Sequence, residues 1–184
     1  MQNLHLDPQK CGLLVVDIQE RMMRVIPEKE TVVKNSVLLL KTAKALGMPV
    51  VATTQYVARI GPLLDEISAE MVDIEPIDKL EFGCFYNIQA KAHLQSFPDV
   101  TTWICCGVET HICMYQTVLG GLESGYKMWI PADAVYSRTP LNYETGLERI
   151  RQVGGVVGNT EMIIYELLHR AGTPEFKELL PFLK

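Results

Sequence analysis

Three residues of unlike chemistry, Asp17, Lys79 and Cys113, each follow a stretch that is typical of a buried strand. A thiol can attack a carbonyl carbon, a carboxylate can take up the thiol proton, and an ammonium group stabilises a thiolate. Because parallel strands end at the same edge of a sheet, the three side chains can converge there. The pattern predicts nucleophilic catalysis on a carbonyl compound, with Cys113 as the nucleophile.

The sequence around Cys113 reads TTWICCGVETHICMYQTVLGGL over residues 101–122, where a short apolar run turns at Gly107 and a helical pattern begins. The N-terminus of a helix carries partial positive charge, so we expect the pKa of a thiol in its first turn to be lowered. Most free cysteines are instead buried and fill the core as small hydrophobic residues. Taken alone, the position of Cys113 leaves both interpretations open.

The two proposed partners of Cys113 also have structural alternatives. Asp17 ends the apolar run GLLVVD, which is typical of a central parallel strand, but an aspartate can equally cap a loop or a helix. Lys79 leads into the loop LEFGCF at residues 80–85, whereas most lysines lie on the surface. Buried charges are costly unless they are paired, and a structural protein gains little from an ammonium and a carboxylate beside a thiol. The complete set of three favours catalysis.

The rest of the chain alternates between strand and helix patterns. We expect strands at residues 12–17, 50–54, 71–77, 101–106, 127–130 and 156–157, and helices at 28–46, 63–70, 88–95, 111–124, 141–153, 160–169 and 173–180. Pro76 makes the third strand an edge strand. This alternation predicts an α/β fold, one parallel sheet with helices on both faces. A length of 184 residues fits a single domain spanning 1–184.

Composition excludes several functional classes. The formal net charge is −5 and no cluster of lysine or arginine is present, so we expect no nucleic-acid partner. No apolar stretch approaches the roughly 20 residues that span a bilayer, and no signal-peptide core is seen, so we expect no membrane partner and a cytoplasmic location. The cysteines number five, without a C-x-x-C pair, which predicts free thiols. The four histidines are scattered, which argues against a metal site.

Several motifs together resemble a known family. The segments LLVVDIQ at residues 13–19, GVETHICMYQT at 107–117 and PADAVYSR at 131–138, with Lys79 before its phenylalanine-rich loop, resemble the isochorismatase-like cysteine hydrolases over nearly the whole chain. The resemblance implies a three-layer α/β/α sandwich, Rossmann-like, with a six-stranded, mainly parallel sheet. It places the catalytic triad of that family on Asp17, Lys79 and Cys113.

The same resemblance carries further expectations about the site. It implies a non-proline cis peptide between Val108 and Glu109, and an oxyanion hole made by the backbone amides of Glu109 and Cys113. It also implies a homo-oligomer. The residues that we expect to contact a small-molecule substrate are Gln55, Tyr56, Phe82, Glu109 and Thr110.

The resemblance also narrows the subfamily. Nicotinamidases of this family carry an Asp-x-His metal pair after the second strand, where this chain has TTQY at residues 53–56. Isochorismatases proper generally lack the cysteine that is present here as Cys113. The TTQY segment, the loop after Lys79 and the closing GTPEFKEL are most similar to the isochorismatase domain-containing proteins. We therefore expect no metal and no cofactor.

The sequence predicts an enzyme that hydrolyses a C–N bond of a small amide through an acyl-enzyme on Cys113. Two other functions stay open: a non-catalytic binding or scaffold protein on the same fold, and a thiol redox sensor in which Cys84 would resolve an oxidised Cys113. Cys84 could also be a pocket thiol or a packing residue. Asp133 is expected to have a structural role, in hydrogen bonds with the turn at residues 137–138.

Overall fold

A computed structural model describes residues 5–183. The strands are β1 Cys11–Val16, β2 Val50–Gln55, β3 Ile77–Lys79, β4 Thr102–Val108, β5 Lys127–Pro131, β6 Val135–Tyr136 and β7 Val156–Gly158. The helices are α1 Glu20–Met23, α2 Lys29–Ala45, α3 Val57–Ile60, α4 Asp65–Ser68, α5 Ile88–Gln95, α6 Tyr115–Glu123, α7 Pro140–Gln152, α8 Thr160–Leu168 and α9 Pro174–Leu179. A single π-helical turn, η3 Thr110–Met114, leads into α6.

The strands form one sheet in the order β3-β2-β1-β4-β5-β7, and every adjacent pair is parallel. This confirms the predicted six-stranded parallel sheet, to which the two-residue strand β6 is added beside the end of β4. After β1 the chain builds outward through β2 and β3, and then returns to place β4 on the other side of β1. In open α/β sheets, ligands bind at such a reversal of strand order, beyond the carboxyl ends of the strands. The reversal here lies between β1 and β4.

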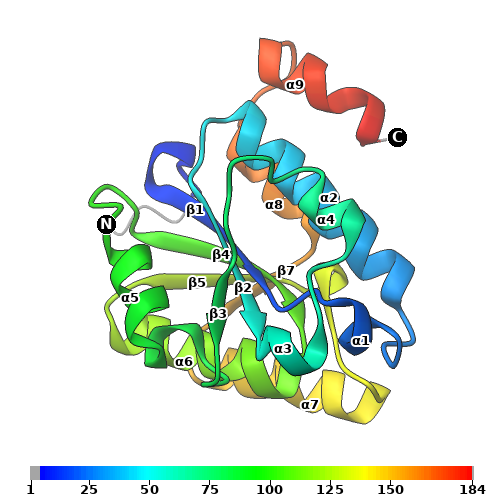
Figure 1. The fold of residues 1–184 in the computed structure, drawn as a ribbon. Helices are drawn as coiled ribbons and strands as arrows, with labels where there is room; N and C mark the ends of the chain where they lie inside the picture. The colour runs from blue at the N-terminus through cyan, green and yellow to red at the C-terminus, as the bar shows by residue number, and fades with distance from the viewer. Residues whose placement is uncertain (1–4, 184) are drawn as a thin grey trace.

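Helices cover both faces of the sheet, as Figure 1 shows. Side chains of β1 alternate between the faces, so that Leu13 and Val15 join the core under α2 and α8, while Leu14 and Val16 join the core under α5, α6 and α7. All six residues of β1 are buried, as the continuous apolar run predicted. The three-layer α/β/α arrangement is therefore confirmed.

Two local predictions were wrong, and both corrections concern the site. The strand expected at residues 71–77 is mostly irregular, and β3 begins only at Ile77, because Pro76 has no N–H to donate to a neighbouring strand. Lys79 is the last residue of β3, so it lies at a strand end, as expected. Residues 19–27 lie between the strand and the helix predicted at 12–17 and 28–46, where we expect a connecting loop or short turn, but they contain the short helix α1. Among residues 5–183, no helix is both long and apolar enough to cross a bilayer.

Candidate active site

Asp17 is the first residue after β1 and is completely buried. Its backbone has a φ of 55°, which is uncommon for a residue other than glycine. The backbone N–H of Asp17 donates to the carbonyl of Thr53, and the Thr53 hydroxyl donates to Oδ1 of Asp17 over 2.8 Å. The end of β2 thus holds the carboxylate at the end of β1.

Lys79 occupies the end of β3 with 1% of its surface exposed. Its Nζ donates to Oδ2 of Asp17 over 2.6 Å and to Oε1 of Gln55 over 2.8 Å. Burial is the largest single effect and acts to lower the pKa of Lys79, but the charge and hydrogen bond of Asp17, together with Cys84 and Cys113, outweigh it and the pKa is raised. Lys79 is therefore a buried ammonium ion, and its two hydrogen bonds fix the orientation of the side chain.

Gln55 is fixed by its own hydrogen bonds. Its Nε2 donates to the carbonyl of Leu80, and its backbone N–H donates to Oε1 of Gln19 over 2.7 Å. The side-chain amide of Gln19 donates in turn to the carbonyls of Gln55 and Gly61. Sequence reasoning did not assign a role to Gln19, although it lies two residues after Asp17 in the LLVVDIQ motif.

The backbone after β4 places the third triad residue. Gly107 has a φ of 130°, and a Cβ atom there would collide with the backbone carbonyl of Val16 on β1. The peptide between Val108 and Glu109 is cis, as the resemblance implied. The η3 turn follows at once and carries Cys113. The absence of a side chain at Gly107 thus allows β4 to pack closely against β1, just before the η3 turn that contains Cys113.

Cys113 is 3% exposed, and its thiol lies near enough to the Asp17 carboxylate for the negative charge to act on it. Burial and the charge of Asp17 raise the pKa of the thiol, and the opposing effect of Lys79 is smaller. The expected lowering of the Cys113 pKa is therefore wrong for the free protein. The residue lies in a single π-helical turn and faces a carboxylate, so the attraction expected at a helix N-terminus does not prevail. The resting thiol is protonated.

The structure brings together all three predicted triad residues. Asp17 interacts with both of the others, because it accepts a hydrogen bond from the Lys79 ammonium and its charge acts on the Cys113 thiol. This places a proton acceptor, a positive charge and a nucleophilic sulfur at the reversal point of the sheet.

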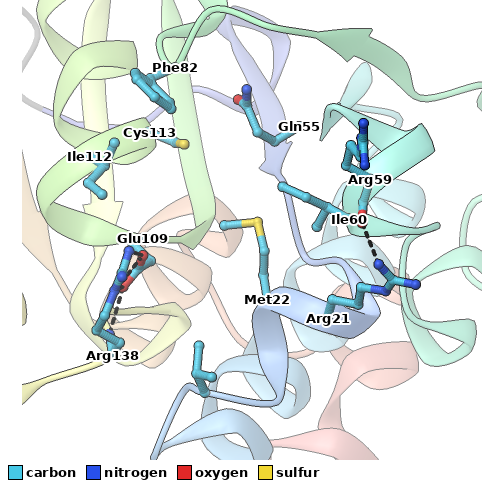
Figure 2. Close-up of a pocket in the computed structure, with 11 residues that line it drawn as sticks. Arg21, Met22, Gln55, Arg59, Ile60, Phe82, Glu109, Ile112, Cys113 and Arg138 are labelled. Carbon is cyan, nitrogen blue, oxygen red and sulfur yellow. Dashed lines mark hydrogen bonds and ion pairs between the residues drawn. The ribbon is translucent and has the colours of Figure 1, made fainter.

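A cavity of about 340 Å³ opens at Cys113. Figure 2 shows Cys113 and Phe82 on one side, Met22 and Ile60 facing them, and Glu109 with Arg138 along a third side. Its lining residues are Arg21, Met22, Val25, Gln55, Arg59, Ile60, Phe82, Glu109, Ile112, Cys113 and Arg138.

The predicted substrate contacts divide into two groups. Gln55, Phe82 and Glu109 line the cavity, whereas Tyr56 and Thr110 are not among its lining residues. Tyr56 has a left-handed backbone conformation before α3 and is 43% exposed. Thr110 is completely buried, since the η3 turn directs it into the protein. All five were expected from their position in the sequence, which does not reveal whether a side chain points into the cavity.

Glu109 forms an ion pair with Arg138 at the cavity wall. Nη2 of Arg138 lies 2.6 Å from Oε1 of Glu109, and the backbone N–H of Arg138 donates to Oε2 over 2.8 Å. Burial acts to raise the pKa of Glu109, but the hydrogen bonds from Arg138 lower it overall. Glu109 is therefore ionised and its charge is balanced.

Asp133 has the expected structural role but a different partner. Its Oδ1 accepts from the backbone N–H and the hydroxyl of Thr160, at 2.7 and 2.8 Å, and so anchors the start of α8. The prediction that Asp133 would bond to the turn at residues 137–138 was wrong. Arg138 in that turn binds Glu109, and the Ser137 hydroxyl lies 3.0 Å from Nδ1 of His111.

Cys84 lies directly beneath the triad without lining the cavity. Its thiol is fully buried, 3.7 Å from the Thr53 hydroxyl, and its backbone N–H donates to Thr117. Burial is the main cause of its raised pKa. These contacts describe a packed thiol. Within the described residues 5–183, no three His, Cys, Asp or Glu side chains are grouped so that they could hold a metal ion.

Comparison with known proteins places this chain in a family. The sequence profile of the isochorismatase domain matches residues 11–162. This chain belongs to the isochorismatase family. As a member of that family it is an isochorismatase-like hydrolase.

Named relatives cover almost the whole of this family member. It is 36% identical over 183 residues to the secreted isochorismatase effector Isc1 of Phytophthora sojae, a match that covers 97% of this chain and 87% of the relative. It is 33% identical to isochorismatase domain-containing protein 2 of Xenopus laevis, covering 95% and 83%. A structure described as MAR1 ribonuclease from Caenorhabditis elegans superposes with a TM-score of 0.91 at 25% identity, covering 97% and 92%.

Proposed function

We propose that this protein is a metal-independent cysteine hydrolase that cleaves the C–N bond of a small amide through an acyl-enzyme on Cys113. One observation carries the proposal: Asp17 is hydrogen-bonded to Lys79 and acts electrostatically on Cys113, whose side chain lines a cavity. A cavity of about 340 Å³ admits a small molecule.

The first chemical step begins from the neutral thiol. As the Cys113 sulfur attacks the amide carbonyl carbon, Asp17 accepts the thiol proton, and a C–S bond forms while the carbonyl π electrons move to oxygen. In our proposal the backbone amides of Glu109 and Cys113 stabilise that oxyanion. A proton acceptor near the thiol removes the need for a resting thiolate.

The intermediate then collapses and the C–N bond breaks. The proton held by Asp17 is transferred to the leaving nitrogen, so that ammonia or an amine departs and a thioester remains on Cys113. Asp17 next takes a proton from water, whose oxygen attacks the thioester carbonyl. Cleavage of the C–S bond, with return of the proton to sulfur, gives a carboxylic acid and the free thiol. Throughout, Lys79 keeps its positive charge beside the Asp17 carboxylate.

Ammonia release from a panel of small primary amides tests the reaction. The wild-type protein should release ammonia, and Cys113→Ala should reduce the rate at least about 10³-fold, because the covalent path is lost. Cys11→Ala is the matched control, since Cys11 is a buried cysteine at the other end of β1. Intact mass spectrometry after rapid acid quench should show the acyl group on wild type only.

The absence of turnover with every amide would return the non-catalytic interpretation. Turnover that survives Cys113→Ala would instead exclude an acyl-enzyme on Cys113. The name of the Caenorhabditis elegans neighbour makes RNA a necessary control substrate. We expect no RNA cleavage, because the net charge of −5 disfavours binding to a phosphate backbone.

We also propose a cytoplasmic homo-oligomer made of one domain per chain. Leu80 and Phe82 in the loop after β3 are 65% and 50% exposed, and Ile88 at the start of α5 is 85% exposed; we propose that a second copy covers these apolar side chains. Light scattering during gel filtration should give a multiple of the 20.7 kDa mass, and Ile88→Asp should reduce it. Fractionation of cells that express the tagged protein tests the location.

A further inference from the structure

The positively charged side chains at and beneath the cavity outnumber the carboxylates that pair with them. Lys79 is paired with Asp17, and Arg138 with Glu109. Arg21 and Arg59 also line the cavity, and among residues 5–183 neither lies within ion-pair distance of a carboxylate. Both side chains are exposed, so one edge of the cavity has two solvated positive charges without an ion-pair partner among the described residues, in a protein whose formal net charge is −5.

Arg21 and Arg59, which we call the arginine edge, come from two short helices. Arg21 belongs to α1 and Arg59 to α3, and Nη1 of Arg21 donates to the backbone carbonyl of Arg59 over 2.7 Å. Figure 2 shows both on the side of Ile60, across the cavity from Arg138. The hydrogen bond ties the two helices together and orients the Arg21 guanidinium, while the Arg59 side chain extends from the same segment.

Apolar side chains occupy the space between this edge and the nucleophile. Met22, Ile60, Ile112 and Phe82 line the cavity around Cys113. An occupant that reaches from the thiol to the arginine edge therefore needs an apolar body with an anionic end. Guanidinium groups bind carboxylates through directed, charge-assisted hydrogen bonds, and adjacent like charges favour an anion between them.

We propose that the substrate is an anionic amide. Its carboxylate binds Arg21 and Arg59, its short apolar chain lies along Met22 and Ile60, and its amide carbon lies at Cys113. The amide end rests on the proposed function, whereas the anion site stands on the arginine edge alone.

The binding test uses ligands that cannot be hydrolysed. Hexanoate carries the anion on an apolar chain, and 1-hexanol is its neutral counterpart of the same length. Dissociation constants are measured by ligand-observed NMR for wild type, for Arg21→Gln/Arg59→Gln and for Arg24→Gln. Arg24 is an exposed arginine at the end of α1 that does not line the cavity, and it is the matched control.

We expect wild type and Arg24→Gln to bind hexanoate at least about fivefold more tightly than the double variant, with 1-hexanol unchanged. The wild-type preference for hexanoate should shrink as salt increases. Equal hexanoate affinity in wild type and the double variant, or no hexanoate binding by wild type, would overturn the anion site. Circular dichroism of the double variant confirms that it is folded.

A kinetic comparison then separates the two proposals. With 6-amino-6-oxohexanoate, the double variant should raise KM and leave kcat nearly unchanged, whereas hexanamide should show no change in either. Hexanoate binding without hydrolysis of any amide would overturn the proposed reaction and leave the anion site standing. Hydrolysis of hexanamide with equal efficiency to the anionic amide would overturn the substrate class alone.

Discussion

The ammonium of Lys79 lies 2.6 Å from the carboxylate of Asp17, and neither side chain has any exposed surface. A buried pair of this kind contributes little net stability compared with apolar residues, but either charge alone would be costly. The pair is therefore best explained by the chemistry of the neighbouring thiol.

Removal of one partner should destabilise the fold strongly. Lys79→Met leaves the Asp17 carboxylate buried and unpaired, and we expect it to lower the free energy of unfolding by about 3–5 kcal/mol. Urea denaturation measures the change. Lys41→Met is the control, because Lys41 pairs with Glu70 at a partly exposed site and should cost about 1 kcal/mol or less.

The double variant Asp17→Asn/Lys79→Met refines this prediction. It removes both charges, so it should be more stable than Lys79→Met although it has lost activity. A double variant as unstable as the sum of its single changes would show that the two charges do not compensate each other.

The reactivity of Cys113 should change in opposite directions in two variants. Burial and the Asp17 charge raise the pKa of the thiol, so in wild type it should react with iodoacetamide more slowly at pH 8 than in the unfolded chain. Asp17→Asn removes the opposing negative charge and leaves Lys79, so alkylation should become faster while amide hydrolysis is lost. Lys79→Met should slow alkylation further. Peptide mapping identifies the alkylated cysteine.

A low-pKa Cys113 in the resting protein would contradict this view. It would appear as fast alkylation of wild type near pH 6, with a plateau at higher pH. Cys105, which is fully buried in β4, serves as the internal control for unfolding during the assay.

The Glu109–Arg138 pair should contribute to stability in a defined pH range. Since the folded-state pKa of Glu109 is lowered, its contribution is present above the unfolded carboxyl pKa of about 4.3, and is lost as pH falls through the lower folded value. Glu109→Gln should therefore lower the melting temperature at pH 7 and change it much less near pH 3. Glu161→Gln, at an exposed position on α8, should show no such difference.

The close approach of β4 to β1 can be tested at Gly107. Gly107→Ala should destabilise the fold by more than about 3 kcal/mol, because its methyl group would collide with the Val16 backbone, which cannot move without separating two central strands. Gly125→Ala also places alanine at positive φ, but in open space, and should cost only about 1–2 kcal/mol. Similar losses in the two variants, by thermal denaturation, would refute the steric explanation.

Sequence reasoning succeeded where one strong local signal decides the structure. The strand β1 was predicted because a continuous apolar run indicates burial on both faces of a sheet. The helix α2 was predicted because apolar residues at helical spacing indicate burial of one face. Residues 71–77 misled the prediction, because their apolar content resembles a strand while Pro76 delays pairing until Ile77.

The electrostatics of the site depend on tertiary distances and were not predictable in this way. The pKa of Cys113 follows from its burial and from Asp17, which is far away in sequence. Arg21 and Arg59 belong to no recognisable motif, and their relation emerges only when α1 and α3 pack beside the cavity. Gln19 is part of the LLVVDIQ motif, but its role was not predictable because its hydrogen bonds reach Gln55 and Gly61, which are distant in sequence.

The strand order has a further consequence for how this protein could diverge. The proposed triad groups are held where strands end, and the register of β1 with β2 and β4, and of β2 with β3, sets their separation. The arginine edge lies instead on two four-residue helices outside the sheet. Reactivity and recognition are thus encoded in separable parts of the chain, so that a descendant could acquire a new substrate by altering α1 and α3 while inheriting its catalytic groups unchanged.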